Sequence, residues 1–326
     1  MLSIEKEIFN INSDAGFSEM AIKVFHFQYH NNSVYQNWVN QMNINPEKVN
    51  STEKIPFLPI GFFKNNRVIS GNKNNSTVFT SSSTTSQTPS KHYVNKIEMY
   101  EESFTGTFEM FYGACSQYCI IALLPGYVQR GDSSLIYMVK KLIEKSENNE
   151  SRIYDGIKDE LISQIESLKK GKQKVILIGV SYALMDLSKM VQLSYDFIVM
   201  ETGGMKGKRR ELTKAELHEY LKKGFAIKNI ESEYGMTELL SQAYSKGNGL
   251  YECAPWMKFF IREITDPLKL IADNKTGGIN VIDLANLYSC SFIATQDLGK
   301  LNKQNQLQLM GRFDHSDVRG CNLMAE

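Results

Sequence analysis

The chain has 326 residues, of which 42% are hydrophobic and 22% charged, a composition typical of a folded globular protein and not of a disordered or fibrous one. Its 37 Lys and Arg residues almost balance its 36 Asp and Glu residues, which leaves a formal net charge of +1. This balance gives no indication of nucleic acid or an anionic membrane as a partner, so any anion site must be local.

Cysteine usage and the apolar runs bear on the location of the protein. The five cysteines are odd in number and lack metal-ligand spacing, apart from a C-x-x-x-C pair inside an apolar run, which is typical of reduced thiols. The N-terminal MLSIEKEIFN carries acids where a signal peptide needs a basic region. The longest apolar run, CIIALLPGYV, is interrupted by Pro125 and is too short to span a bilayer. The sequence therefore predicts a cytoplasmic protein with no membrane span.

The first eighty residues predict helices followed by extended chain. Residues 15–45 carry apolar and aromatic side chains at mixed three- and four-residue spacings, which predicts a helical cap. KIPFLPIGFFK, residues 54–64, contains two prolines and is predicted to enter the main sheet as an extended segment. NSTVFT, residues 75–80, is short and β-prone, so we expect a strand that leads into the polar stretch after it.

From about residue 95 the sequence alternates between helical stretches and apolar runs. We expect helices near residues 98–112, 133–147, 156–170 and 182–193. The apolar runs between them predict buried parallel strands with crossover helices: CIIALLPG, KVILIGV and YDFIVMETGG, the last running into a glycine turn. After residue 240, shorter β-prone runs separated by turn residues predict an antiparallel or barrel-like region: WMKFFIREI, GGINVIDL, CSFIATQDLG and QLQLMGRFD.

The stretch FTSSSTTSQTPSKHY, residues 79–93, is the most biased segment of the chain, with nine Ser or Thr residues among fifteen. Small hydroxyl side chains and backbone N–H groups after a strand can surround an anion such as a triphosphate. A solvated linker has the same composition, so composition alone leaves both interpretations open. Lys91 and His92, directly after the hydroxyl-rich residues, favour a charged ligand.

Two further segments carry side chains suited to a nucleotide. EYGMTEL, residues 233–239, follows the strand-like GFAIKNIES, and its tyrosine could stack on a base while Thr237 and Glu238 bind a phosphate oxygen and a divalent cation. A helix start has a similar composition. Asp297, in ATQDLG, is expected at a strand end, where a carboxylate can accept two ribose hydroxyls, although ordinary turn chemistry also explains it.

In this order and with these spacings, the segments resemble the motifs of the adenylate-forming superfamily of acyl- and aryl-acid ligases. The matching segments are Thr80 to Ser86 with Pro89 for the phosphate loop, residues 202–206 (TGGMK) for the glycine-rich strip at the adenine, Tyr234 to Glu238 for the Y-G-x-T-E box, Thr295 to Asp297 for the T-G-D ribose motif and Gly311 to Asp314 for the G-R-x-D hinge.

Within that superfamily the chain resembles the acyl-protein synthetase (LuxE) family over nearly its whole length. The segments that carry this resemblance are FHFQYHNNSVYQNW, KIPFLPIGFFK, KVILIGVSY, APWMK and RGCNLM. The resemblance implies an α/β fold, the large N-terminal domain of the adenylate-forming enzymes, with two mixed sheets flanked by helices and a small β-rich subregion. The small C-terminal domain and its catalytic lysine are expected to be absent.

The same resemblance implies a single large domain over residues 1–326. Its expected parts are a helical cap at about 1–50, an α/β core at about 51–240, a β-rich subregion at about 241–311 and a C-terminal tail at 312–326.

The resemblance implies an ATP-dependent acid–thiol ligase. A carboxylate attacks the α-phosphorus of Mg²⁺-bound ATP, pyrophosphate leaves, and a thiol then attacks the acyl-adenylate. In the acyl-protein synthetases this thiol is a cysteine near the C-terminus, and RGCNLM aligns Cys321 with it. Arg319 would lower the pKa of that thiol. The implied substrate is a fatty acid, and the implied partner is an acyl-accepting protein, a reductase or a carrier.

The resemblance assigns the site residues one by one. They are Ser82, Ser83, Thr84, Thr85 and Ser86 around the phosphates; Gly203, Gly204, Tyr234 and Gly235 by the adenine; Thr237 and Glu238 at the phosphate and magnesium; Asp297 and Arg312 at the ribose; Cys321 as the nucleophile; and Lys91, His92, Arg312 and Arg319 as cations in place of the absent lysine.

The phosphate loop departs from the family pattern at two positions. Ser83 and Ser86 stand where the family usually has glycines, and a serine reaches positive φ less readily and crowds a close phosphate. Three interpretations therefore stay open: an acyl-protein synthetase acylated on Cys321, a coenzyme A or carrier ligase like the phenylacetate ligases, and a degenerate protein that binds a nucleotide or acyl chain without turnover. The other four cysteines, Cys115, Cys119, Cys253 and Cys290, are expected in the core.

Overall fold

The computed structural model describes residues 3–71, 76–82, 88–127, 129, 131–203, 212–271 and 274–312. The chain divides into two compact units. Unit 1 comprises Met1–Ser76, Tyr93–Asn95 and Pro255–Glu326, and unit 2 comprises Thr77–His92 and Lys96–Ala254. Each unit contains a mixed sheet flanked by helices, as the family resemblance implied.

The sheet of unit 2 has the strand order β10-β9-β8-β7-β6-β4-β5. Strands β4 to β8 run parallel to one another, whereas β9 pairs antiparallel with both β8 and β10. Their bounds are β4 Tyr118–Leu123, β5 Arg152–Tyr154, β6 Lys174–Val180, β7 Phe197–Thr202, β8 Glu231–Tyr234, β9 Ala243–Ser245 and β10 Leu250–Cys253. All six residues of β4 are buried, and so are the last six of β6, which explains why both read as continuous apolar runs.

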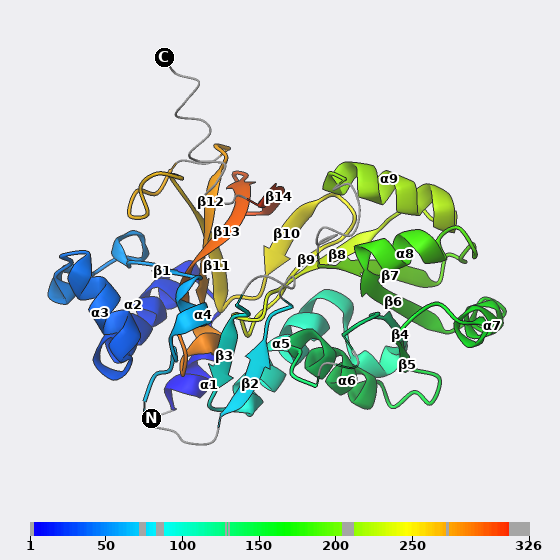
Figure 1. The fold of residues 1–326 in the computed structure, drawn as a ribbon, viewed down its shortest axis with the longest axis horizontal. Helices are drawn as coiled ribbons and strands as arrows, with labels where there is room; N and C mark the ends of the chain where they lie inside the picture. The colour runs from blue at the N-terminus through cyan, green and yellow to red at the C-terminus, as the bar shows by residue number, and fades with distance from the viewer. Residues whose placement is uncertain are drawn as a thin grey trace, which may run out of the picture. The chain divides into compact units, whose positions relative to one another are not determined.

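Helices cover both faces of this sheet. Helices α8 and α9 lie on one face and α5 and α6 on the other (Figure 1). The bounds are α5 Ile97–Tyr112, α6 Ser134–Ser146, α7 Asp159–Leu168, α8 Ser181–Leu187 and α9 Lys214–Phe225, with a 3-10 turn η3 at Cys115–Gln117. The order of strands and helices from β4 to β7 confirms the predicted crossover units.

A two-stranded sheet, β2 Thr77–Thr80 and β3 Lys91–Val94, flanks the hydroxyl-rich stretch. The two strands approach where the Ser81 N–H donates to the Ser90 carbonyl at 3.0 Å and the Ser90 N–H donates to the Ser81 hydroxyl at 2.9 Å. The predicted layout of a strand that leads into a polar loop is therefore confirmed for the described residues.

Unit 1 contains the antiparallel strands β11 to β14 and the short β1, which pairs parallel with β13. The antiparallel region predicted after residue 240 is confirmed for these strands. The bounds are β1 Leu58–Pro59, β11 Met257–Arg262, β12 Gly277–Asp283, β13 Phe292–Leu301, β14 Leu307–Arg312, α1 Ile4–Phe9, α2 Asp14–Asn31, α3 Ser33–Gln41, α4 Phe62–Asn65 and the 3-10 turns η1 Pro46–Lys48, η2 Thr52–Lys54 and η4 Leu284–Asn286.

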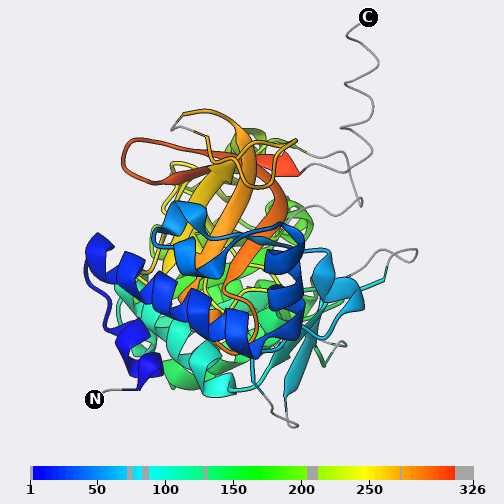
Figure 2. The same ribbon diagram turned by 90° about the vertical axis from the view of Figure 1, so that its left-hand side faces the viewer.

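The N-terminal helices of unit 1 are packed against its strands (Figure 2). Gln28 of α2 is fully buried, and its amide donates to the carbonyls of Asn286 at 3.0 Å and Leu287 at 2.8 Å. The ring of Tyr35 stacks on Phe292 of β13 at 5.7 Å between ring centres. The predicted helical cap is therefore an integral part of the unit 1 core.

Three predicted elements differ in the structure. The helix expected at 182–193 ends at Leu187, and Gly224 of α9 packs against Ser188, the next residue, so closely that an added Cβ would lie 2.6 Å from its hydroxyl oxygen. The predicted strand GFAIKNIES is wrong for its first residues, which complete helix α9, and β8 begins only at Glu231. KIPFLPIGFFK forms just two residues of strand before helix α4 buries Phe63.

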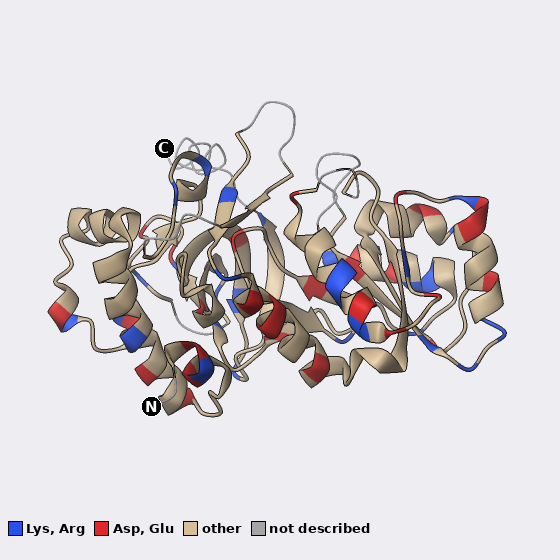
Figure 3. Ribbon diagram, turned by 90° about the horizontal axis from the view of Figure 1, so that it is seen from below, with Lys and Arg blue, Asp and Glu red and all other residues tan. Residues whose placement is uncertain are grey.

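The charges, the helix lengths and the cysteine positions in the structure bear on three predictions. Acidic and basic residues are interspersed over the elements seen in Figure 3, consistent with the near-zero net charge. Among the described helices, none combines the length and apolar character that a bilayer crossing needs. Cys115, Cys119 and Cys290 are buried as predicted, whereas Cys253 is only half-buried.

Candidate functional site

Three neighbouring strands of unit 2 end together at one edge of the sheet. Thr202, the last residue of β7, pairs with Val180 at the end of β6 and with Glu233 near the end of β8. The Gly203 turn follows β7 with φ +70, and Gly235 follows β8. Ligands of open α/β sheets bind at the carboxyl ends of such strands. The structure thus places Thr202 and Gly203 of the TGG segment beside the start of the Y-G-x-T-E segment.

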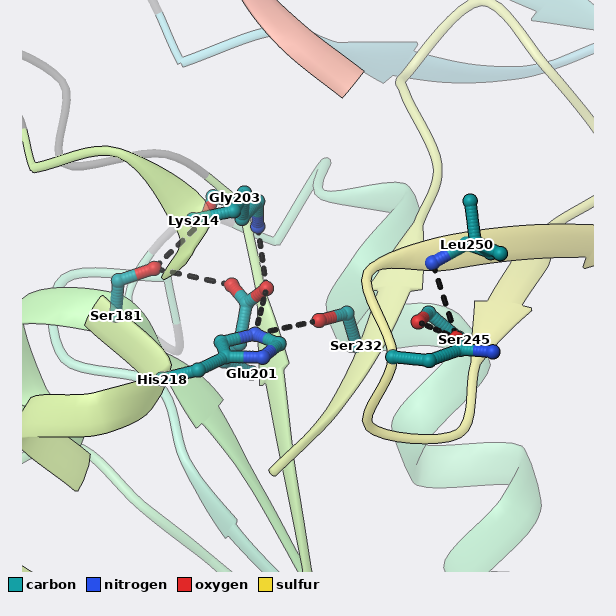
Figure 4. Close-up of polar contacts among 9 residues, drawn as sticks. Ser181, Glu201, Gly203, Lys214, His218, Ser232, Ser245 and Leu250 are labelled. Carbon is teal, nitrogen blue, oxygen red and sulfur yellow. Dashed lines mark hydrogen bonds and ion pairs between the residues drawn. The ribbon is translucent and has the colours of Figure 1, made fainter. Parts of the chain in front are cut away.

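Glu201 of β7 is the centre of a buried polar group at this edge (Figure 4). The carboxylate is fully buried and pairs with the Lys214 ammonium of α9. The Ser181 hydroxyl lies 3.1 Å from Glu201 Oε2, and His218 Nε2 lies 3.6 Å from Oε1. Burial alone would raise the pKa of Glu201, but the charge of Lys214 and hydrogen bonds from His218, Lys214 and Ser232 outweigh it and lower that pKa to about 2. The carboxylate is therefore ionised at neutral pH.

Helix α9 supplies the cation because of how its N-terminus is built. The Thr213 hydroxyl accepts from the Glu216 N–H at 3.2 Å, and the Glu216 carboxylate accepts from the Thr213 N–H at 2.8 Å, so the two residues form a capping box. This cap starts the helix at Lys214 and places His218 one turn later on the same face. His218 Nε2 also lies 3.0 Å from the Ser232 hydroxyl of β8. The cap thereby fixes two partners of Glu201.

A second buried acid, Glu233 of β8, lies on the opposite face of the sheet from Glu201. The alternation of side chains along β7 and β8 pairs Glu201 with Ser232 and Thr202 with Glu233. The Thr202 hydroxyl donates to the Glu233 carboxylate, and an added Cβ on Gly235 would lie 2.4 Å from Glu233 Oε1. Burial, with a smaller contribution from the Glu201 charge, raises the pKa of Glu233 to about 7. Glu233 therefore changes charge near neutral pH, unlike Glu201.

The Y-G-x-T-E segment is held from two sides. The Tyr234 side chain is buried and packs edge-on against Tyr251 of β10, with ring centres 6.1 Å apart. The Thr237 carbonyl accepts from His92 Nδ1 at 2.7 Å, which requires the proton on that nitrogen. Glu238 is buried. The segment contains no helix, which excludes the helix-start interpretation.

Lys91 and His92 take different positions although they are adjacent on β3. Lys91 is exposed, whereas His92 is fully buried against the Thr237 carbonyl. This contact brings the residues after the hydroxyl-rich stretch beside the Y-G-x-T-E segment. His92 therefore hydrogen-bonds to the Y-G-x-T-E segment itself, whereas the Lys91 side chain lies at the protein surface.

Unit 1 brings its two predicted ribose residues together. Asp297 and Arg312 are direct partners across β13 and β14, and Arg312 Nε lies 3.2 Å from Asp297 Oδ1. The Asp297 N–H donates to the Thr295 hydroxyl at 3.1 Å. The expectation that Asp297 ends its strand is wrong, because pairing with β14 extends β13 to Leu301.

Arg262 is a buried cation of unit 1 that the sequence analysis missed. Its guanidinium donates to the carbonyls of Ile279 at 2.8 Å and Thr295 at 2.7 Å, and to Asn280 Oδ1 at 2.9 Å. Burial lowers the pKa of Arg262 to about 10, against the opposing charge of Asp297. Gly278 leaves room for it, since an added Cβ there would lie 2.6 Å from the guanidinium carbon. Arg262 therefore supports the strand that carries Asp297.

Several predicted site residues lie outside the described residues: Ser83, Thr84, Thr85, Ser86, Gly204, Arg319 and Cys321. Ser82 is described and half-buried. Glu201, Lys214, Glu233 and Arg262 were missed, although a sequence signal existed for two of them. Glu201 ends an apolar run directly before TGG, and Arg262 interrupts the apolar run of β11.

A shallow groove of about 420 Å³ lies on α5 in unit 2, and none of the site residues described above lines it. It is lined by Glu98, Glu101, Glu102, Thr105, Gly106, Glu109 and Lys145. Four carboxylates and one ammonium give it an acidic surface, which disfavours a triphosphate. The groove is therefore not proposed as a nucleotide site.

Many solved structures are similar to this chain, and three of them illustrate the match. An open conformation of 2-hydroxyisobutyryl-CoA ligase in complex with 2-HIB-AMP and CoA matches with TM-score 0.68 and 9% identity, covering 94% of this chain and 72% of that chain. ATP-bound MatB from Rhodopseudomonas palustris matches with TM-score 0.53 and 13% identity, over 74% and 50% of the two chains. O-succinylbenzoate coenzyme A synthetase (MenE) from Bacillus subtilis with AMP matches with TM-score 0.52 and 17% identity, over 76% and 51%.

These similarities define the fold. It is the fold of the large N-terminal domain of the adenylate-forming enzymes, and the chain spans about half the length of the MatB structure. No known family model matches the sequence, and no curated protein is significantly similar to it.

The charge of Glu233 predicts a pH dependence of stability. The pKa of Glu233 is about 7 in the folded protein and 4.5 in an unperturbed glutamate. Between pH 4.5 and pH 7, the folded protein therefore keeps the Glu233 proton that the unfolded chain has released. Stability therefore falls as pH rises through this range, whereas the contribution of Glu201 is lost only below pH 4.5. We expect Glu233→Gln to be about 1–3 kcal/mol more stable than the wild type at pH 8 and close to it at pH 5.

Urea unfolding at pH 5 and pH 8 measures this difference. Glu219→Gln, an exposed carboxylate on α9, is the matched control and should follow the wild type at both pH values. Equal unfolding midpoints of Glu233→Gln and the wild type at pH 8 would contradict the assigned charge of Glu233.

Proposed function

We propose that the protein activates a carboxylic acid with ATP to give an acyl-adenylate. The observation that carries the proposal is the meeting of the Gly203 turn and the Y-G-x-T-E segment at the carboxyl ends of β7 and β8. It is supported by the fold, since the similar structures of MatB and MenE contain ATP and AMP and that of the 2-hydroxyisobutyryl-CoA ligase contains an acyl-adenylate.

In the proposed reaction, a substrate carboxylate oxygen attacks the α-phosphorus of ATP. A new oxygen–phosphorus bond forms, the bond to the bridging oxygen of the β-phosphate breaks, and that oxygen leaves with pyrophosphate. Adjacent cations stabilise the charge that develops on the phosphate. Mg²⁺, when bound, supplies part of this charge, and Glu238 is the residue proposed to hold it.

The chain's own residues are assigned as follows. Ser82 to Ser86 and Thr237 bind the phosphates, and Lys91 adds positive charge from the surface of β3. His92 holds the Thr237 carbonyl and so orients its neighbours. Gly203, Gly204, Tyr234 and Gly235 contact the adenine. Asp297 accepts the ribose hydroxyls, and Arg312 orients its carboxylate through their ion pair.

The second step of the proposal transfers the acyl group from the adenylate to a thiol. A thiolate sulfur attacks the acyl carbon, the mixed anhydride opens and AMP leaves. We assign this thiol to Cys321, which would make the protein an acyl-protein synthetase acting on a fatty acid, with a reductase or carrier protein as final acceptor in the cytoplasm. Coenzyme A is the second candidate acceptor, because the similar 2-hydroxyisobutyryl-CoA ligase was solved with it bound.

Acid-dependent exchange of labelled pyrophosphate into ATP tests the first step. We expect exchange with at least one acid in a series of increasing chain length. Asp297→Asn should weaken ATP binding by about 1.5–3 kcal/mol, because the ribose loses a charged hydrogen-bond acceptor. Asp266→Asn, an exposed loop acid of the same unit, is the control and should match the wild type. No exchange with any acid, although ATP binds, would favour a binding protein without turnover.

Labelling with a radioactive acid and ATP tests the second step. We expect label on the wild-type protein in a thioester that hydroxylamine cleaves, releasing the acyl group as its hydroxamate. We expect no label on Cys321→Ser because serine is a far weaker nucleophile. Cys253→Ala, at a half-buried cysteine, should retain the label. Undiminished label on Cys321→Ser would exclude autoacylation at this residue, and acyl-CoA formation by that variant would support the coenzyme A alternative.

A further inference from the structure

The buried group around Glu201 takes no direct part in the proposed chemistry, yet it joins four elements at the strand edge. Glu201 belongs to β7, Ser181 to α8, Lys214 and His218 to α9, and Ser232 to β8. Replacing a buried ion pair by apolar side chains of similar volume is often neutral or stabilising for a fold. A contribution to stability alone therefore explains this buried polar group poorly. Its effect on the position of neighbouring segments explains it better.

The group holds the described residues on both sides of residues 204–211. Its Ser181 hydroxyl lies 3.1 Å from Glu201 Oε2 and 3.0 Å from the Gly203 carbonyl oxygen, so it links the carboxylate to the glycine turn (Figure 4). On the other side, Lys214 is the first residue of α9 and its ammonium pairs with the same carboxylate. One side chain therefore fixes the end of β7 and the start of α9.

We propose that Glu201 is a positioning residue for the nucleotide: its carboxylate fixes the Gly203 turn and the start of α9 at the carboxyl edge of the sheet. Its effect on ATP rests on the proposed function, whereas its effect on local order rests on this geometry alone. Glu201 lies beneath the turn and acts through Ser181 and Lys214. A merely structural role would change stability without changing nucleotide binding.

Three variants and one control separate these roles. Glu201→Gln leaves the Lys214 charge uncompensated, whereas Glu201→Gln with Lys214→Met removes both charges. Ser181→Ala removes the link to Gly203 and changes no charge. The control is Glu231→Gln at the other end of β8, where the carboxylate accepts from the Tyr112 hydroxyl at 2.7 Å. The amide oxygen of the introduced glutamine can accept the same hydrogen bond.

The variants are compared by urea unfolding, by the KM for ATP and kcat in pyrophosphate exchange, and by amide hydrogen exchange of peptides covering residues 201–203 and 212–218. For the double variant we expect a urea midpoint near that of the wild type, a KM for ATP raised about tenfold or more, and amide exchange at least about tenfold faster in these peptides only. Ser181→Ala should show the same changes with smaller size, and Glu231→Gln should show none of them.

The proposal is overturned if the double variant recovers wild-type stability together with wild-type KM and amide exchange. Should that variant fail to fold, Ser181→Ala decides: unchanged KM and unchanged exchange at 201–203 also overturn it. Absence of pyrophosphate exchange in the wild type would instead contradict the proposed function. In that case the hydrogen-exchange comparison alone supports or overturns the positioning role, because it needs no turnover.

Discussion

The carboxyl edge of the unit 2 sheet depends on one constraint, the compensation of the buried charge on Glu201. An ionised carboxylate removed from water is costly unless opposite charge and hydrogen bonds replace its hydration. Lys214 and His218 provide that replacement from α9, and Ser181 provides it from α8. Compensation of a single charge therefore fixes where two helices begin relative to the end of β7.

The two acids at this edge behave differently because they lie on opposite faces of the sheet. Glu201 faces α9 and is kept ionised by Lys214. Glu233 accepts a hydrogen bond from the Thr202 hydroxyl, and its pKa is about 7. Gly235 accommodates the second acid because any larger residue would meet its oxygen. The edge thus combines one fixed negative charge with one that depends on pH, directly beside the segments proposed to contact the adenine.

The sequence predicted the parallel core well because β4 and β6 are buried on both faces and read as unbroken apolar runs. It predicted helix α9 poorly. The apolar residues at the end of this stretch, Phe225, Ile227 and Ile230, are typical of a strand. The helix signal lies upstream, in the capping box of Thr213 and Glu216. Asp297 and Arg312 were singled out by motif, but only the register of β13 and β14 pairs them. Glu201 carries a sequence signal, since it ends the apolar run of β7, but the burial of both Glu201 and Glu233 depends on tertiary contacts that the sequence does not show.

The central claim is that a nucleotide binds at the carboxyl ends of β7 and β8. Photolabelling with 2-azido-ATP, followed by mapping of the modified peptides, tests it most directly because it requires neither turnover nor knowledge of the acid. The account predicts label in peptides that contain residues 197–203 or 231–238, and loss of that label when unmodified ATP competes. Competable label confined to the acidic surface of α5, or to α6 and α7, would contradict it.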